Sequence, residues 1–181
     1  MTKFYNSLKL VAFLIPALFL LGSCSEEEDS SGIDTNMIDY SGNKQEIKQA
    51  VIREPGTLYS HLMKGFIMSN MDITPGVGLG LTVFSSDESN LEAGDYQFID
   101  VNSEEFTNDN VAGMNFFSGS FLLDENNDKQ LDDSDEIDVN GGTVTITGTQ
   151  PNYTVIFDLT LENGKTVKGN YSGTFEMADD N

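Results

Sequence analysis

The sequence contains few of the side chains that most enzymes and nucleic-acid-binding proteins use. It has one cysteine, one histidine and no tryptophan among its 181 residues. Lysine and arginine number 9 against 30 aspartates and glutamates, which gives a formal net charge of −21. So large an acidic excess repels phosphate backbones and anionic head groups, and it argues against nucleic-acid binding. The same excess favours divalent cations as ligands.

The scarcity of nucleophiles and bases argues against catalysis. His61 is the single imidazole, and it shares strand parity with Tyr59 and Met63, which indicates an ordinary strand residue. A zinc site would need more His or Cys, and there is no Gly-x-Ser-x-Gly elbow. Carboxylate pairs leave a glycosidase as the enzymatic alternative, although such pairs arise by chance throughout an acidic chain. We therefore predict that the protein is not an enzyme.

The N-terminus has the charged-then-apolar pattern of a secretory signal peptide. Lys3 and Lys9 precede an apolar run over residues 10–21, and the lone Cys24 follows it. The run of about twelve residues is shorter than the roughly 20 that a membrane-spanning helix needs. Residues 1–23 are therefore predicted to be a cleaved export signal.

The sequence Leu21-Gly22-Ser23-Cys24 resembles the lipobox of bacterial lipoproteins. That resemblance implies that the Cys24 thiol is diacylated, that the peptide is cut before it, and that the new N-terminus is acylated. The mature chain would keep 158 residues and 7 of the basic side chains, with no thiol left for a disulfide. The alternative is a soluble secreted protein with a free thiol.

Residues 24–42 are predicted to be the acylated cysteine and a flexible tether. The run Ser25-Glu26-Glu27-Glu28-Asp29 is charged and has nothing to bury, so it favours disorder. It also resembles the acidic export tag of Bacteroidetes surface lipoproteins. This resemblance implies attachment to the outer leaflet of the outer membrane, exposed at the cell surface, rather than to its periplasmic face.

Residues 43–181 are predicted to form a single antiparallel β-domain, because the dominant hydrophobic period is two. The pair 153–161 and 166–177 alternates apolar and polar residues around Asn163-Gly164, which predicts a β-hairpin. No window of a dozen residues predicts an amphipathic helix. The remaining predicted strands cover residues 46–52, 59–69, 77–84, 95–101, 115–123 and 142–149.

About eight short strands separated by Gly, Pro, Asn and Asp clusters favour an all-β fold. We predict an antiparallel β-sandwich, with a small calycin-like β-barrel as the alternative. The arrangement of signal, acidic tether and β-domain ending in the pattern from Gly164 to Gly173 resembles small Bacteroidetes lipoproteins. That resemblance is loose and implies no activity.

One acidic run between two predicted strands carries the chemistry of a metal site. Oxygen side chains recur at Asp124, Asn126 and Asp128, and Asp135 closes the run. Calcium takes six to eight hard oxygen ligands, which alternate residues on a tight loop can turn inward. Without a cation, the four aspartates 124, 128, 132 and 135 would repel one another, so the run predicts bound Ca²⁺. The alternative is a solvated acidic turn, since Asp and Asn favour turns.

This run resembles the calcium loop of EF-hands, and more closely the dockerin variety. The resemblance implies side-chain ligands from Asp124, Asn126, Asp128 and Asp135, with the backbone carbonyl of Gln130 and with Asp132 binding directly or through water. It departs from the pattern at Lys129, where the family has glycine, and at the flanks, which are strands rather than helices. A left-handed non-glycine residue costs about 1–2 kcal/mol, so we expect weakened affinity.

Two functions follow from these features. The leading one is a lipid-anchored, non-catalytic, calcium-binding β-domain displayed on the bacterial outer membrane for binding or structural roles, with an extracellular glycan or protein as the expected kind of ligand. The runner-up is a glycan-binding module of a polysaccharide uptake system. The chain has no tryptophan to stack on sugar rings, so Tyr40, Tyr59 and Tyr96 are the candidate stacking residues.

Overall fold

A computed structural model of the chain describes residues 35–104, 106–126, 128 and 134–178. These residues form eleven strands and one four-residue helix, α1 (Asn108–Val111). In chain order the strands are β1 (Met37–Tyr40), β2 (Asn43–Glu46), β3 (Gln49–Leu58), β4 (His61–Asn70), β5 (Val77–Ser85), β6 (Gly94–Phe98), β7 (Phe116–Leu123), β8 (Glu136–Thr149), β9 (Asn152–Leu161), β10 (Thr166–Thr174) and β11 (Glu176–Met177).

All eleven strands belong to one mixed sheet, in the order β11-β3-β4-β5-β7-β6-β8-β9-β10-β1-β2. Most neighbours are antiparallel, whereas β6 pairs with β7 in parallel and β11 pairs with β3 in parallel. β8 pairs with β7 over Glu136–Asp138 and with β6 farther along. Between these stretches its register against β9 shifts between Val139 and Gly141, the kind of bulge that bends a strand.

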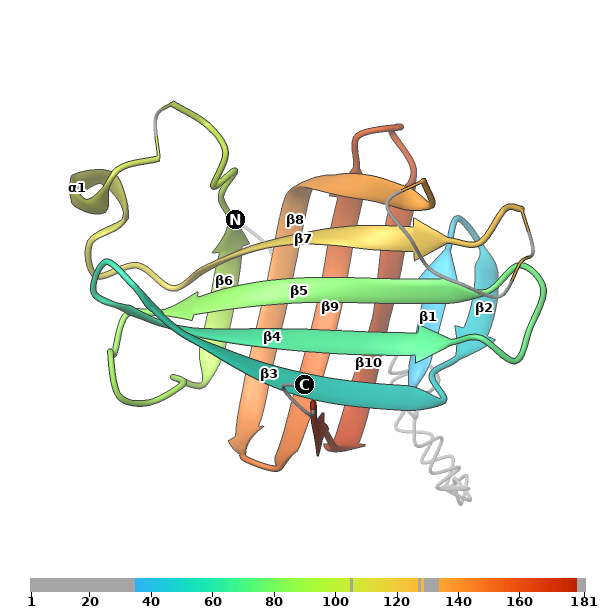
Figure 1. Ribbon diagram of the computed structural model, residues 1–181, viewed down its shortest axis with the longest axis horizontal. Coiled ribbons are helices and arrows are strands. Elements are labelled where there is room, and N and C mark those ends of the chain that lie inside the picture. Colours follow the sequence, from blue (N-terminus) through green and yellow to red (C-terminus); the bar gives the residue numbers. More distant parts are fainter. Residues whose placement is uncertain (1–34, 105, 127, 129–133, 179–181) are drawn as a thin grey trace, which may run out of the picture. The chain divides into compact units, whose positions relative to one another are not determined.

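The sheet is curled into a half-barrel. In Figure 1 the strands β3, β4, β5 and β7 lie across β8, β9 and β10, so the sheet folds back over itself. The two ends of the strand order are close in the chain, because only Ile47 and Lys48 separate β2 from β3. Their amides donate to backbone oxygens of Asn36 and Ser69, which fixes this corner to its neighbours.

The core lies between the overlapping parts of the curled sheet. β9 shows the alternation most clearly, since every second side chain from Tyr153 to Leu161 is at most 5% exposed. Phe66 of β4 contacts Tyr153 of β9 and Phe175, which follows β10, through edge-to-face ring contacts. Tyr40 of β1 stacks on Phe121 of β7 with a ring separation of 4.7 Å. Aromatic rings therefore join strands that are far apart in the sheet order.

A second, smaller apolar cluster lies outside this core. It is centred on Phe84, Val111 and Phe116, which are at most 3% exposed, and it includes partly buried residues of β3, β4 and the β6–β7 connection. On β4 the odd-numbered His61 and Met63 contact this second cluster, whereas the even-numbered Phe66 and Met68 belong to the main core. The β6–β7 connection thus covers part of the opposite face of the sheet.

The all-β class and the strand periodicity are confirmed. The sandwich of about eight strands is not confirmed, since the described strands form one hydrogen-bonded sheet of eleven. The sheet also begins earlier than predicted. Met37–Tyr40 pairs with Val167–Asn170, so residues assigned to the tether at 24–42 belong to the β-domain. These four residues alternate in burial, and a four-residue strand is too short to show a convincing period in the sequence.

None of the helices in the described part of the chain is long and apolar enough to cross a membrane.

Candidate metal centre

The acidic run connects the end of β7 to the start of β8. The structure describes Asp124, Glu125, Asn126, Asp128, Ser134 and Asp135 of this run. Two predicted calcium ligands, Gln130 and Asp132, lie outside the described residues, as does Lys129 at the position where the resembling loops have glycine.

The two ends of the run are buried and tied together. Asp124 is 1% exposed and Asp135 is 6% exposed. The Leu123 amide donates to the Asp135 carbonyl over 3.0 Å, and the Asp124 amide donates to the Gly76 carbonyl over 3.0 Å. Burial of a carboxylate is unfavourable unless hydrogen bonds or a cation compensate it. The base of the loop therefore holds two buried carboxylates, and the Asp128 amide supplies one such hydrogen bond to Asp124.

Side chains of two predicted ligands, Asp124 and Asn126, meet at one turn above this base. The Asp128 amide donates to Asp124 Oδ1 over 3.1 Å and to Asn126 Oδ1 over 2.8 Å. Both side-chain oxygens therefore face the same N–H group, while Asn126 and Asp128 are exposed. Side-chain oxygens of Asp124 and Asn126 are thus gathered on a tight turn around the backbone amide of Asp128.

The donor chemistry of this turn fits a hard cation, because carboxylate and amide oxygens are what calcium prefers. Across the described residues, no group of three or more His, Cys, Asp and Glu side chains is close enough to hold a metal ion. A calcium ion here would need further oxygen donors, and Gln130 and Asp132 are the predicted ones.

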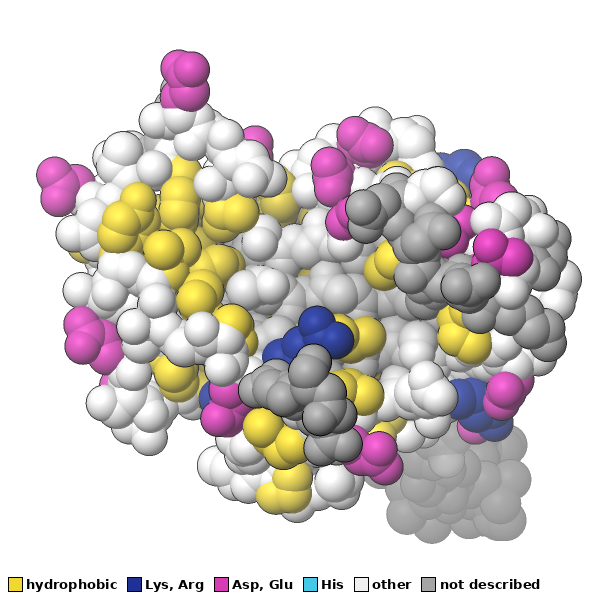
Figure 2. Space-filling model, in the orientation of Figure 1, with side chains coloured by type: hydrophobic (Ala, Val, Ile, Leu, Met, Phe, Trp, Pro, Cys, Tyr) yellow, Lys and Arg dark blue, Asp and Glu magenta, His cyan; other side chains and the backbone are white. Residues whose placement is uncertain are grey.

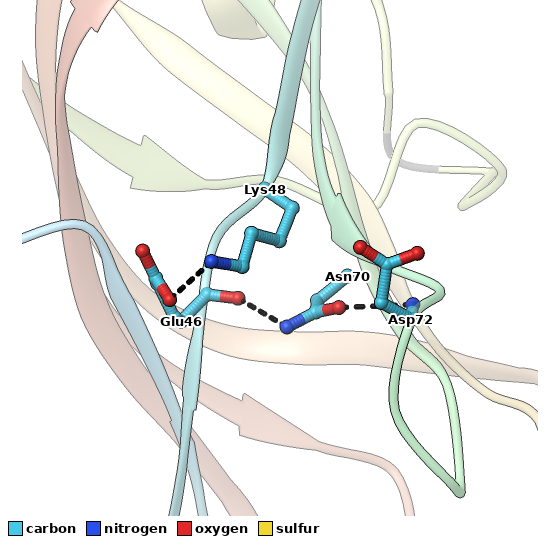
Figure 3. Close-up of polar contacts among 4 residues, drawn as sticks. All are labelled: Glu46, Lys48, Asn70 and Asp72. Carbon is cyan, nitrogen blue, oxygen red and sulfur yellow. Dashed lines mark hydrogen bonds and ion pairs between the residues drawn. The ribbon is translucent and has the colours of Figure 1, made fainter.

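The neighbouring β4–β5 connection supports the base of the loop. Asn70, at the end of β4, is 2% exposed. Its Nδ2 donates to the Glu46 carbonyl over 2.7 Å, and its Oδ1 accepts from the Asp72 amide over 3.0 Å (Figure 3). Lys48 pairs with the Glu46 side chain in the same view. Asn70 therefore joins the β2–β3 corner to the connection whose last residue, Gly76, holds the Asp124 amide.

A basic side chain also lies near the acidic run. Lys165, in the β9–β10 turn, places its ammonium 4.9 Å from the centre of the Tyr40 ring. The adjacent Tyr40 hydroxyl raises the pKa of Lys165, and the negative charge of Glu125 raises it further. The residue of the acidic run that acts on this positive charge is Glu125, which is not one of the predicted ligands.

The three tyrosines predicted to stack on sugars differ in exposure. Tyr40 is 8% exposed and Tyr96 is fully buried. Burial raises the Tyr96 pKa to about 12, and its hydroxyl donates to the Glu92 carbonyl over 2.6 Å. Neither ring can stack on a sugar from solvent. Tyr59 is 49% exposed and can do so.

Tyr59 also has an unusual backbone. It is the first residue of the two-residue turn between β3 and β4, and its φ is 52°. This left-handed region suits Gly or Asn, and it costs an aromatic residue of the order of 1–2 kcal/mol. The ring lies against Phe106, with centroids 5.6 Å apart and planes tilted by 45°.

His61 is enclosed, in agreement with its reading as a strand residue. It is 1% exposed, and its Nε2 lies 3.2 Å from the Val111 carbonyl and 3.1 Å from the Met114 carbonyl. Its ring packs edge-on against Phe116. The imidazole therefore helps to hold the β6–β7 connection on the sheet. Cys24, the predicted lipidation site, lies outside the described residues.

Sequence reasoning missed an ion pair between a buried lysine and an exposed glutamate. The Lys64 side chain is 8% exposed, and it pairs with Glu54 and donates to Gln150 Oε1 over 3.0 Å. The hydrogen bond from Lys64 lowers the pKa of Glu54. The three residues line a hollow of about 440 Å³ together with Tyr153. The signal was present, because Lys64 shares parity with the core residues Phe66 and Met68.

Two further hollows lie on the described surface. One, of about 520 Å³, is lined by the carboxylates of Asp100, Glu136, Asp138 and Glu162 among others. These four residues come from three separate segments and form no motif in the sequence. The other, of about 330 Å³, lies beside the β6–β7 connection and includes Phe106, the residue on which Tyr59 packs.

Comparison with known proteins gives no relative. No family model matches the chain, and neither a curated protein nor a solved structure resembles it significantly.

Proposed function

We propose that the protein is a lipid-anchored, non-catalytic, calcium-binding β-domain displayed on the bacterial outer membrane. The proposal that the protein binds calcium is supported by the geometry of the β7–β8 connection. Two buried aspartates form its base, and oxygens of Asp124 and Asn126 converge on the Asp128 amide. The bound ion would offset carboxylate repulsion and hold β7 and β8 in register at this end of the sheet.

Removal of one exposed ligand tests the calcium site without disturbing the core. Titration of the complete chain with Ca²⁺, in a non-ionic detergent after treatment with a chelator, is expected to give a dissociation constant of about 10⁻⁴–10⁻³ M, typical of extracellular modules. At one hundred times that constant the ion would stabilise the fold by about 2.7 kcal/mol, or roughly 5–10 °C in melting temperature for a domain of this size. Asp128→Ala is expected to abolish both the binding heat and the shift.

Glu125→Gln is the matched control, because it removes a neighbouring charge that is not a predicted ligand. It is expected to keep the binding heat and the shift. Mg²⁺ at equal concentration controls for general screening of an acidic protein, and it is expected to shift the melting temperature less. Equal losses in Asp128→Ala and Glu125→Gln, or equal effects of the two ions, would refute a calcium loop.

The lipid anchor is proposed from the lipobox resemblance and is tested at Cys24. Expressed in a Gram-negative host, the chain is expected to partition into the detergent phase after a temperature-induced phase separation. The Cys24→Ser variant is expected to move to the aqueous phase or to keep its signal peptide, whereas Ser25→Ala behaves as the original chain. Protease treatment of intact cells checks surface display. Equal partition of Cys24→Ser and the original chain would contradict the anchor.

The absence of catalysis is supported by the environment of the single histidine. Its Nε2 lies between two backbone carbonyls, and its ring is enclosed by the second apolar cluster. A general base must reach a substrate proton within hydrogen-bonding distance. An imidazole so placed has no route to a substrate in solution.

Glycan binding is the second candidate, and the exposure of Tyr59 favours it. The Tyr59 ring is half exposed, and its left-handed backbone conformation does not stabilise the turn. Stability of the turn therefore does not explain a tyrosine at this position. Exposed aromatic rings commonly serve as contact surfaces because they combine a large apolar face with a polar tip.

For the closure of the sheet, we propose the barrel alternative rather than a sandwich of about eight strands. The continuous pairing supports it, since a sandwich requires two sheets that are not hydrogen-bonded to each other. So does the short link from β2 to β3 at the two ends of the strand order.

A further inference from the structure

An exposed aromatic ring and a hollow meet where the β3–β4 turn contacts the β6–β7 connection. Tyr59 packs on Phe106, and Phe106 lines the hollow of about 330 Å³. Met114, which also lines the hollow, is 40% exposed. Figure 2 shows hydrophobic side chains gathered on this side of the visible face, over α1 and the β6–β7 connection. We call Tyr59 and the residues of this hollow the Tyr59 site.

The aromatic part of the site is packed against buried rings. Phe106 contacts Phe116 edge-on at 5.8 Å, and Phe116 stacks on Phe84 at 4.4 Å. Phe84 and Phe116 are at most 3% exposed, so this series of ring contacts ends in the second apolar cluster. The Tyr59 ring therefore rests on a packed base and presents about half of its surface to solvent. A rigid platform loses little conformational entropy when it binds.

The hollow combines an apolar floor with polar side chains, as small-molecule sites do. Its volume of about 330 Å³ lies at the low end of the range for such sites. Apolar lining comes from Ile99, Phe106, Val111 and Met114, and polar lining comes from Asp100, Ser103 and Asn110. Carboxylate, hydroxyl and amide groups offer both acceptors and donors to the hydroxyl groups of a ligand.

The charge of the residues that line the hollow argues against anionic ligands. Its described lining residues include one carboxylate, Asp100, and no lysine, arginine or histidine. Phosphate, sulfate and carboxylate ligands would meet repulsion without a compensating cation. A purely apolar ligand would displace water from the Asp100 carboxylate without offering it a hydrogen bond. An uncharged ring with one apolar face and several hydroxyl groups avoids both the charge repulsion and the unreplaced loss of water.

We propose that the Tyr59 site binds a neutral saccharide, with one sugar ring stacked on Tyr59 and a neighbouring ring in the hollow. This inference rests on the second candidate function, glycan binding, and it specifies where that binding occurs. Asp100 binds hydroxyl groups, and Met114 contacts the apolar face of the ring. The left-handed turn holds the Tyr59 ring in place for stacking.

The site is tested with neutral and acidic oligosaccharides on a glycan array, followed by calorimetry on the best neutral binder. The complete chain is used, in a detergent without a sugar head group. Neutral oligosaccharides are expected to bind and acidic ones are not. Tyr59→Asn is expected to weaken the affinity at least tenfold. Because asparagine accepts a left-handed backbone, this variant keeps or raises the melting temperature, which separates ring loss from unfolding.

Met177→Ala is the matched control, since Met177 is also 49% exposed but lies on β11, outside the site. It is expected to leave the affinity unchanged. Saccharide binding that Tyr59→Asn leaves unaltered would overturn the site while keeping the glycan-binding function. Failure of every saccharide would overturn both. Self-association that Tyr59→Asn abolishes, without saccharide binding, would assign the surface to a second copy of the chain and overturn the proposal.

Discussion

Replacement of Gly169 by alanine is expected to destabilise the fold by about 3 kcal/mol, at the upper end of typical overpacking costs. Gly169 lies in β10, opposite Ile38 of β1 and Phe157 of β9. An added Cβ would lie 2.0 Å from the Met37 carbonyl oxygen and 2.8 Å from Phe157 Cζ. The first of these atoms belongs to the backbone, so relief requires β1 to move away from β10. Urea denaturation followed by circular dichroism measures the loss.

Gly80→Ala is the control for this prediction, because it places the same methyl group in another strand interior. A Cβ at Gly80 would meet its nearest atom, the Ser120 carbonyl oxygen, at 3.9 Å, which is ordinary contact. We expect a change within about 0.5 kcal/mol, as for substitutions that disturb no special feature. If the two variants have the same denaturation midpoint, β1 does not pack on β10 as described.

This position also shows how a short strand can escape sequence reasoning. β1 has four residues, and only Ile38 and Tyr40 are buried. It is stabilised by pairing with β10, more than 125 residues later in the chain, and such long-range pairing leaves no local periodicity. The adjacent acidic residues made the segment resemble a tether. The long hairpin β9–β10, by contrast, was predictable because ten residues alternate in burial around an Asn-Gly turn.

The metal centre is formed by residues close together in the sequence, whereas the Tyr59 site is formed by residues far apart in it. Asp124, Asn126 and Asp128 are alternate residues of one loop, so the convergence of the Asp124 and Asn126 oxygens on the Asp128 amide could be predicted from spacing alone. Tyr59 and Phe106 are 47 positions apart, and they meet only because the β6–β7 connection folds over the outer face of the sheet. The sequence could suggest Tyr59 as an aromatic residue without indicating that Tyr40 and Tyr96 are buried.

The curl of the sheet was not predictable from strand number. Alternation indicates which face of each strand is buried, but one curled sheet and two stacked sheets bury the same residues. What distinguishes them here is the position of β6 and β8. Both strands pair with β7, so the ladder continues from β7 through β6 and β8 into β9 without interruption.

Phe66→Ala is expected to cost about 3–5 kcal/mol, the range for deleting a buried phenylalanine side chain. Phe66 is fully buried, and its ring meets Tyr153 at 5.3 Å and Phe175 at 5.0 Å, both nearly perpendicular. The three rings come from β4, from β9 and from the segment between β10 and β11. The deletion therefore removes contacts across the curl as well as apolar area.

Two further variants separate these effects. Phe66→Leu retains most of the volume and loses the ring contacts, so it is expected to cost about 1.5 kcal/mol. Ile156→Ala, at a site in β9 that is 43% exposed, is expected to stay within about 1 kcal/mol. Because Phe66 links the overlapping parts of one core, near- and far-ultraviolet circular dichroism should report one coincident transition for each variant. Two separated transitions in Phe66→Ala would mean that the halves of the sheet unfold independently.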